Sequence, residues 1–447
     1  MNQCFATRRP LLDRAKNNAA YEVLFRDMDG LRPGTTARQS PGEALAVFLS
    51  TNNLRQMVGE QMAMINLGPD LLREQITTLI PKEKTLLGIA SGDPLTNTVL
   101  LEQCRALREN GYRFCLNQFT SEESSSPFLQ LSEFVQVDVG GQSDARIAEN
   151  AGLVKKLPRK LLASNVTSEE QYSHCLNLGF DLFEGSFYYK ALSLPHKSIS
   201  ASQTLLLELS SYLARNEDMH KVEGIFKRNP ELTFGLLKLI NSAFFRVQQK
   251  VTSVKQAIAL LGYSNLQKWV GLLLFTVDHR DHGRDPLVEK VLIRGKIMEL
   301  LAERVTGSKT IAESAFVSGC LSLVDVLFAK PLKEIIDKLS LAPEIRDALL
   351  ERQGLLGALL SIAVDLDNDE YDGLETKLSA ASIRPIDLLS IETKAIIEYQ
   401  TSINDELRST TTTQARGYPA APEHSLSHEK EIDQPPLTRA QAGSRHR

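Results

Sequence analysis

Short apolar runs and helical stretches alternate through the first 195 residues. Such alternation of strands and helices is typical of a parallel sheet. Eight such strands predict a closed (β/α) barrel of the TIM type at the start of the chain. With the helical pattern described below, the predicted fold class is a multidomain protein, α/β followed by all-α. The segment is shorter than the roughly 250 residues of a typical barrel, so we expect missing or shrunken helices. The strand candidates are residues 4–8, 20–26, 61–67, 85–90, 113–119, 134–139, 160–166 and 182–188.

Residues 95–110 are a clear helix candidate between two of these strands. Leu100, Leu101, Cys104 and Leu107 recur on one helical face, and Gly111 provides a stop signal. The pattern therefore predicts an amphipathic helix.

The pattern changes near residue 195. From about 200 to 400 the chain is helical throughout and shows no strand alternation, which predicts an all-α domain built by helix packing. From about residue 405, four consecutive threonines and four prolines replace the large apolar residues, and such a segment cannot offset its chain entropy by burial. We expect a barrel at 1–195, a helical domain at 196–404 and a disordered tail at 405–447.

The composition is ordinary for a soluble globular protein, with 42% apolar and 24% charged residues. The net charge of −4 argues against nucleic-acid binding, which usually requires a basic surface. The five cysteines form no C-x-x-C pair and are expected to be reduced thiols in a cytoplasm. The N-terminus has no apolar signal core, and the best membrane candidate, residues 269–277, suits a buried helix. We therefore predict a cytoplasmic protein without membrane or nucleic-acid partners.

Two strand candidates carry polar residues of interest. Residues 21–26 read Tyr-Glu-Val-Leu-Phe-Arg, and residues 113–120 read Arg-Phe-Cys-Leu-Asn-Gln-Phe-Thr. With the ordered series across 1–195, they resemble the EAL family of bacterial cyclic di-GMP phosphodiesterases. That resemblance implies a ligand site with two metal ions at the C-terminal ends of the barrel strands. The positions that keep the family's residue are Glu22, the phosphate-directed Arg26, the ligand asparagine Asn66, and Asp138.

The other family positions have lost their chemistry. Two divalent ions bring four positive charges, amides replace carboxylates poorly, and serine cannot act as a base near neutral pH. Glu184 adds a negative charge where a phosphodiester would sit. We therefore predict a relict ligand site with no catalytic residue, metal or cofactor. The replaced positions are Ser91 for a ligand glutamate, Asn117 and Gln118 for the aspartate pair, Gln136 for a lysine, Ser164 for the general base, and Thr167 for a second glutamate.

The helical part carries a second resemblance. Residues 229–233 (Asn-Pro-Glu-Leu-Thr), 236–243 (Leu-Leu-Lys-Leu-Ile-Asn-Ser-Ala) and 253–262 (Ser-Val-Lys-Gln-Ala-Ile-Ala-Leu-Leu-Gly) resemble the HDOD domain. This HD-type helical fold lacks HD metal chemistry and is regarded as a protein-interaction or signal-output module. The whole chain resembles YuxH-like EAL–HDOD signalling proteins. The motif residues are Asn229, Pro230, Asn241, Ser242, Gly262 and Trp269.

Two further motifs are interpreted as incidental. Residues 278–285 are rich in histidine and aspartate but contain no His-Asp doublet, and their spacing is that of a charged loop. Residues 417–419 spell the Gly-Tyr-Pro motif of HD-GYP phosphodiesterases but fall in the predicted tail.

These resemblances predict a non-catalytic bacterial regulator linked to cyclic di-GMP signalling. It would act by ligand or protein binding through a degenerate EAL barrel and an HDOD output domain. The alternative is a cyclic di-GMP phosphodiesterase with weak residual activity, and a structural dimer scaffold is a third hypothesis. The predicted partners are signalling proteins at the HDOD domain, cyclic di-GMP and a second copy of the chain.

Overall fold

The computed structural model describes residues 5–26, 48–49, 53–68, 77, 79–90, 98–189, 201–214, 219–229, 232–233, 236, 251, 253–276, 285–337, 339 and 341–415. The barrel and the helices that contact it belong to one unit, Met1–Glu406, and Leu407–Arg447 forms a second.

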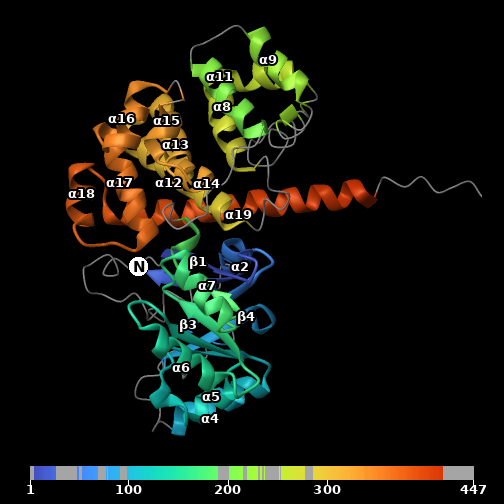
Figure 1. Ribbon diagram of the computed structural model, residues 1–447, viewed down its shortest axis with the longest axis vertical. Coiled ribbons are helices and arrows are strands. Elements are labelled where there is room, and N and C mark those ends of the chain that lie inside the picture. The colour runs from blue at the N-terminus through green and yellow to red at the C-terminus, as the bar shows by residue number, and fades with distance from the viewer. Residues whose placement is uncertain are drawn as a thin grey trace, which may run out of the picture. The chain divides into compact units, whose positions relative to one another are not determined.

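Eight strands close a barrel in chain order, β1 to β8 (Figure 1). Every predicted strand is present, which confirms the barrel. β1 is longer than predicted, and β8 contains only two residues. The strands are β1 (Phe5–Leu12), β2 (Asn18–Arg26), β3 (Met62–Leu67), β4 (Thr85–Ala90), β5 (Arg113–Asn117), β6 (Phe134–Asp138), β7 (Lys160–Ser164) and β8 (Leu182–Phe183).

The first strand departs from the predicted parallel sheet. β1 pairs antiparallel with both β2 and β8, whereas the pairs from β2 to β8 are parallel. The prediction was wrong for β1 because residues 13–17 are too short for a parallel crossover, which needs a dozen or more residues. The Asp13 carboxylate accepts the N–H groups of Ala15 and Asn17 and so fixes this hairpin turn.

The described helices around the barrel are short, in line with the predicted shrinkage. Helix α4 confirms the prediction for residues 95–110 and buries Leu100 and Cys104. Helices α6 and α7 begin at Ser143 and Ser168, whose hydroxyls accept the N–H three residues on. The helices are α2 (Asn53–Val58), α4 (Thr98–Glu109), α5 (Pro127–Leu131), α6 (Asp144–Val154) and α7 (Glu169–Asn177), with 3-10 turns η3 (Lys82–Lys84), η5 (Ser121–Glu123) and η6 (Phe187–Tyr189).

An apolar layer fills the barrel interior, with one side chain from each strand. Side chains two residues apart on a strand share a face, so this layer fixes which neighbouring positions also point inward. The outward faces of the strands pack with the helices in a separate, larger apolar cluster. The layer consists of Leu11, Ala20, Met64, Leu86, Cys115, Phe134, Leu162 and Leu182.

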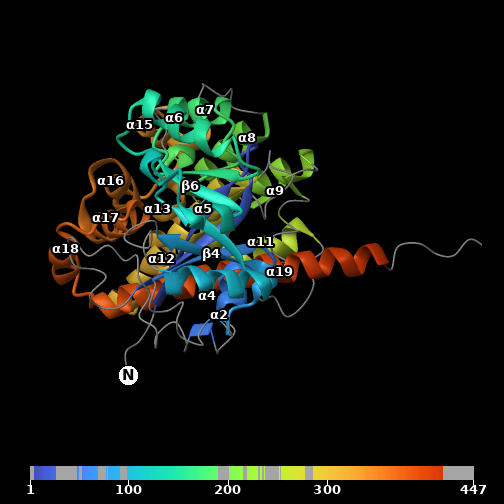
Figure 2. The same ribbon diagram turned by 90° about the horizontal axis from the view of Figure 1, so that it is seen from below.

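The rest of the chain is helical in its described residues, which confirms the all-α prediction, and shares one apolar core. Helix α19 is the long red helix in Figures 1 and 2. The predicted boundary near residue 195 lies outside the described residues. The helices are α8 (Ala201–Ala214), α9 (Met219–Arg228), α11 (Val254–Thr276), α12 (Pro286–Thr306), α13 (Lys309–Leu321), α14 (Val324–Phe328), α15 (Leu332–Ile336), α16 (Pro343–Glu351), α17 (Gly354–Asn368), α18 (Leu374–Ala380) and α19 (Pro385–Ala415).

Helix α12 is one of the helices that contact the barrel, and nearby residues specify both of its ends. The Asp285 carboxylate caps its first turn, Pro286 occupies the first helical position, and Gly307 ends it in the left-handed conformation. A side chain at Gly319 on α13 would meet the Gly295 Cα of α12 at 2.8 Å, so the two helices cross backbone to backbone. This close crossing places α12 firmly in the helical core.

Two sequence-based expectations need correction. Within the described residues, the segment long and apolar enough to cross a membrane is Lys309–Phe328 rather than residues 269–277. It comprises α13 and α14 and is 78% buried, as expected for helices of a protein core. Helix α19 continues to Ala415, so residues 405–415 are helical where disorder was predicted. Extending an existing helix avoids the cost of nucleation. Residues 416–447 lie outside the described residues.

Candidate functional site

A polar layer lies directly above the apolar layer, at the C-terminal ends of the parallel strands. Each of its residues is two positions from an apolar-layer residue on the same strand and therefore shares its inward face. Six members, all except Arg9 and Gly88, are sequence-predicted site residues. The layer consists of Arg9, Glu22, Asn66, Gly88, Asn117, Gln136, Ser164 and Glu184.

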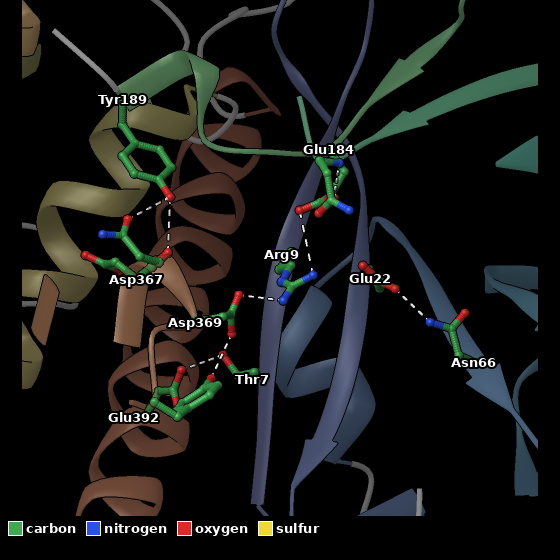
Figure 3. Close-up of polar contacts among 12 residues, drawn as sticks. Thr7, Arg9, Glu22, Asn66, Glu184, Tyr189, Asp367, Asp369 and Glu392 are labelled. Carbon is green, nitrogen blue, oxygen red and sulfur yellow. Dashed lines mark hydrogen bonds and ion pairs between the residues drawn. The ribbon is translucent and has the colours of Figure 1, made fainter. Parts of the chain in front are cut away.

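Hydrogen bonds join three members of this layer in a row. Asn66 Nδ2 donates to Glu22 Oε1 at 2.7 Å (Figure 3). Asn117 Nδ2 in turn donates to Asn66 Oδ1 at 2.8 Å. A Cβ at Gly88 would collide with the Asn66 amide and lie 2.7 Å from Asn117 Nδ2. Gly88 is therefore the residue that leaves space for this amide row, and the sequence alone gave no signal for that role.

One acceptor in the row is left over. Asn117 is 7% exposed, and its Oδ1 is buried without a hydrogen-bond partner among the described residues. A buried unpaired acceptor is costly, so the amide row is incompletely satisfied at this oxygen.

The remaining replaced positions divide between the layer and its surroundings. Ser164 is buried and its hydroxyl donates to the Val137 carbonyl at 3.5 Å, while the Gln136 side chain is also buried. Gln118 is exposed with a φ of 57°, and exposed Thr167 contacts Gln171 of α7. Gln118 and Thr167 follow the ends of β5 and β7 and are not members of the polar layer, although Thr167 lines the cavity described below.

Two carboxylates predicted for the site have local partners. Asp138 follows Gln136 on β6, and its Oδ1 accepts the Gly140 N–H at 2.9 Å in the turn after the strand. Glu184 is 7% exposed, and its Oε2 accepts the Asn165 N–H at 3.1 Å. Burial raises the pKa of Glu184, with Arg9 opposing and Glu22 adding to this shift.

Arg9 is the site residue that the sequence analysis missed. It lies on β1, and its Nη1 is 3.8 Å from Glu184 Oε1 while its Nη2 is 2.5 Å from Asp369 Oδ2. The signal was present in the spacing, because Arg9 is two residues from the inward-facing Leu11. Asp369 follows α17, so no pattern in the barrel segment could have revealed it.

The opposite face of β1 binds the helical domain through a buried polar cluster. Arg8 donates to Glu289 of α12 from both Nε, at 3.1 Å, and Nη2, at 2.8 Å. The second oxygen of Glu289 accepts from Tyr21 at 2.6 Å and Asn18 at 2.7 Å. Arg8 also donates to the Met57 carbonyl, and its guanidinium lies 3.9 Å from the Tyr21 ring centroid. This cluster ties β1 and β2 to α12.

Further contacts extend this interface along β1 and β8. Thr7 Oγ1 donates to Glu392 of α19 at 2.6 Å, and Thr393 exchanges two hydrogen bonds with the Ala6 backbone. Tyr189 in η6 donates to the Asp367 carbonyl at 3.1 Å (Figure 3). The barrel and helices α12, α17 and α19 therefore form a continuous polar interface.

A cavity of about 430 Å³ lies in this interface. β1 and β8 share only the pair Leu12 and Phe183, so the barrel wall opens beyond it. Arg9 and Glu184 line the cavity from the barrel, and Lys290 and Asp369 line it from the helices. The cavity thus connects the edge of the polar layer to the helical domain.

Several predicted site residues cannot be placed in this geometry. The side chains of Arg26 and Trp269 lie outside the described residues. The same holds for the whole of Ser91, Pro230, Asn241, Ser242 and residues 278–284 and 417–419. Asn229 Oδ1 accepts the Leu232 N–H at 3.2 Å, as a helix-start residue does, and Gly262 forms a kink in α11 with a φ of 67°. These two motif residues have structural roles.

The described donors do not fit the two metal ions that the EAL resemblance implies. Among them, no group of three His, Cys, Asp or Glu side chains converges. Glu22 already accepts from Asn66, and Glu184 faces the Arg9 guanidinium, which repels a divalent cation.

Comparison with known proteins defines the class. The HDOD domain family matches residues 203–345, within the helical part. With the closed barrel that precedes it, this gives the chain the architecture of an EAL–HDOD protein and confirms the resemblance predicted from the sequence.

Two curated relatives match most of this chain. The uncharacterized protein YuxH of Bacillus subtilis is 24% identical over 379 residues, covering 82% of this chain and 91% of its own. The cyclic di-GMP phosphodiesterase CdgJ of Vibrio cholerae is 24% identical over 382 residues, covering 84% and 87%.

Solved structures are similar to a smaller share of the chain. The FimX EAL domain from Pseudomonas aeruginosa bound to c-di-GMP has a TM-score of 0.33 at 16% identity, covering 42% of this chain and 90% of its own. Klebsiella pneumoniae BlrP1, in a calcium complex with the same ligand, has a TM-score of 0.33 at 16% identity, covering 41% and 54%.

Proposed function

We propose that this protein is a non-catalytic, cytoplasmic regulator linked to cyclic di-GMP signalling. The barrel binds a ligand, and the HDOD domain binds a signalling protein. The link to this second messenger rests on the EAL–HDOD architecture and on similarity to a protein named as a cyclic di-GMP phosphodiesterase.

The polar layer is the observation that carries this proposal. Metal-dependent phosphodiester hydrolysis needs several oxygen ligands, mostly carboxylates, and a base that activates water. In the layer, the two carboxylates Glu22 and Glu184 are engaged by Asn66 and Arg9. Ser164, at the position of the family's base, is a buried hydroxyl with no basicity near neutral pH. Such a layer favours binding over turnover.

A turnover assay tests the proposal. The full chain is incubated with cyclic di-GMP and excess Mn²⁺, with Vibrio cholerae CdgJ alongside as the positive control, and products are separated by chromatography. We expect no linear dinucleotide above the buffer level. Metal-dependent product that disappears in Glu22→Ala would contradict the proposal.

Weak residual phosphodiesterase activity is the second candidate function. It is favoured by the similarity to CdgJ and by Glu22, Asn66 and Asp138, which keep the family's residue types. The same assay separates the two candidates, because residual activity must depend on the added metal and on Glu22.

A further inference from the structure

Arg9 links the polar layer of the barrel to the helical domain. Figure 3 shows its guanidinium between Glu184, above it at the end of β8, and Asp369 at the end of α17. The Asp369 contact is the shorter of the two, at 2.5 Å against 3.8 Å. The nearer partner of this arginine therefore belongs to the helical domain.

The charges around Arg9 are unfavourable for a second anion. Burial disfavours the charged guanidinium, but Asp369, Glu184 and Glu22 outweigh that effect and raise the pKa of Arg9. Three carboxylates around one guanidinium leave a net negative charge. A phosphodiester that approaches the polar layer thus meets an arginine that is already paired and carboxylates that repel it.

The packing of its own domain holds Asp369 in this position. Asp369 ends α17 in the left-handed conformation with a φ of 55°, and its Oδ1 accepts the Tyr371 hydroxyl at 2.8 Å. Two residues earlier, Asp367 pairs with Lys290 at 2.8 Å and Arg294 at 2.6 Å of α12. Any movement of the end of α17 would therefore change the distance between Asp369 and Arg9.

We propose that Arg9 is an anion-binding residue of the barrel and that Asp369, by occupying it, suppresses ligand binding. This inference rests on the proposed function, because the ligand phosphate is that of cyclic di-GMP. Ligand binding and the docking of α17 on β1 then oppose each other. The coupling is reciprocal: the ligand loosens the docked helix, and a partner that draws the end of α17 away raises affinity for the ligand.

Asp369→Asn tests the coupling by calorimetric titration of the full chain with cyclic di-GMP, without metal. Asparagine tolerates a positive φ and keeps an oxygen for Tyr371, so the variant should fold. We expect at least about a 5-fold gain in affinity, the lower end of typical couplings. Asp337→Asn is the matched control, because Asp337 forms an exposed ion pair with Arg346 in the same domain; its affinity should equal that of the wild type.

The double variant Arg9→Gln/Asp369→Asn tests whether the effect depends on Arg9. Its affinity for cyclic di-GMP should not show the increase expected of Asp369→Asn alone. A gain that persists there would show that removal of a negative charge suffices, and would overturn the role of Arg9. Equal and measurable affinities for wild type and Asp369→Asn would overturn the coupling while ligand binding stands. No binding by either protein would overturn both this inference and ligand binding by the barrel.

Discussion

Arg8 and Arg9 are adjacent on β1, yet they point to opposite faces of the strand and meet the helical domain differently. The Arg8 side chain is 1% exposed and pairs with Glu289, which is 6% exposed. The Arg9 side chain is 33% exposed and divides its nitrogens between Glu184 and Asp369. Both arginines line the interface cavity, but the outward one is fully enclosed by its buried partners, whereas the inward one is partly exposed to solvent.

The difference in burial decides what each ion pair can do. A buried charge that loses its partner is strongly destabilising, so the Arg8 pair has one arrangement. A partly exposed pair contributes little to stability because solvent screens it. Arg9 can therefore exchange partners at low cost, which a signalling contact requires.

The largest effect is expected from Arg8→Met, which removes the cation of the buried Arg8–Glu289 ion pair. It leaves Glu289 buried without its cation and should cost about 3–5 kcal/mol of unfolding free energy. Arg9→Met, the matched control, should cost less, because its nearer partner Asp369 is 28% exposed and stays solvated, while buried Glu184 is the more distant partner at 3.8 Å. Urea denaturation measures both. Combining Arg8→Met with Glu289→Gln removes both charges and should recover part of the loss; equal losses in the two single variants would contradict the comparison.

A smaller effect is expected from Gly88→Ala, which disturbs the polar layer inside the barrel and leaves the Arg8–Glu289 cluster unchanged. The new methyl group collides with the amide row and should cost about 1–3 kcal/mol. Gly152→Ala in α6 is the control, because no atom lies within 4 Å of its new Cβ; it should be neutral or stabilising by up to about 1 kcal/mol. A neutral Gly88→Ala in thermal denaturation would mean that the Asn117–Asn66 contact does not require this space.

The smallest effect is expected from Glu184→Gln, measured as melting temperature against pH. Burial raises the pKa of Glu184 above its ordinary value of 4.5, so the folded state holds this proton more tightly than the unfolded state. The wild type therefore loses stability as pH rises from 4.5 through the folded pKa. Glutamine cannot ionise, so the melting temperature of the variant should rise relative to that of the wild type as the pH increases from 4 to 8. Glu344→Gln, at an exposed site, should show no such trend.

The sequence predicted the barrel correctly, and most of the residues in the polar layer were among those that it singled out. Apolar runs marked all eight strands, and Glu22, Asn66, Asn117, Gln136, Ser164 and Glu184 all lie in the layer. It missed Gly88, whose role depends on two side chains from neighbouring strands, whereas Gln118 and Thr167 lie just beyond the strand ends that carry the layer. Strand periodicity reports direction along one strand, but not what neighbouring strands place in the same space.

The amino-acid pattern by itself determined the strands and the helical character of the second part. Both depend on residues close together in the chain. Only the tertiary structure decided that β1 runs antiparallel, that Arg8 meets Glu289 and that Asp369 reaches Arg9 across 360 positions. Such pairings are set by packing between the barrel and the helical domain, because burial and partner distance, rather than sequence spacing, fix the energy of a charge.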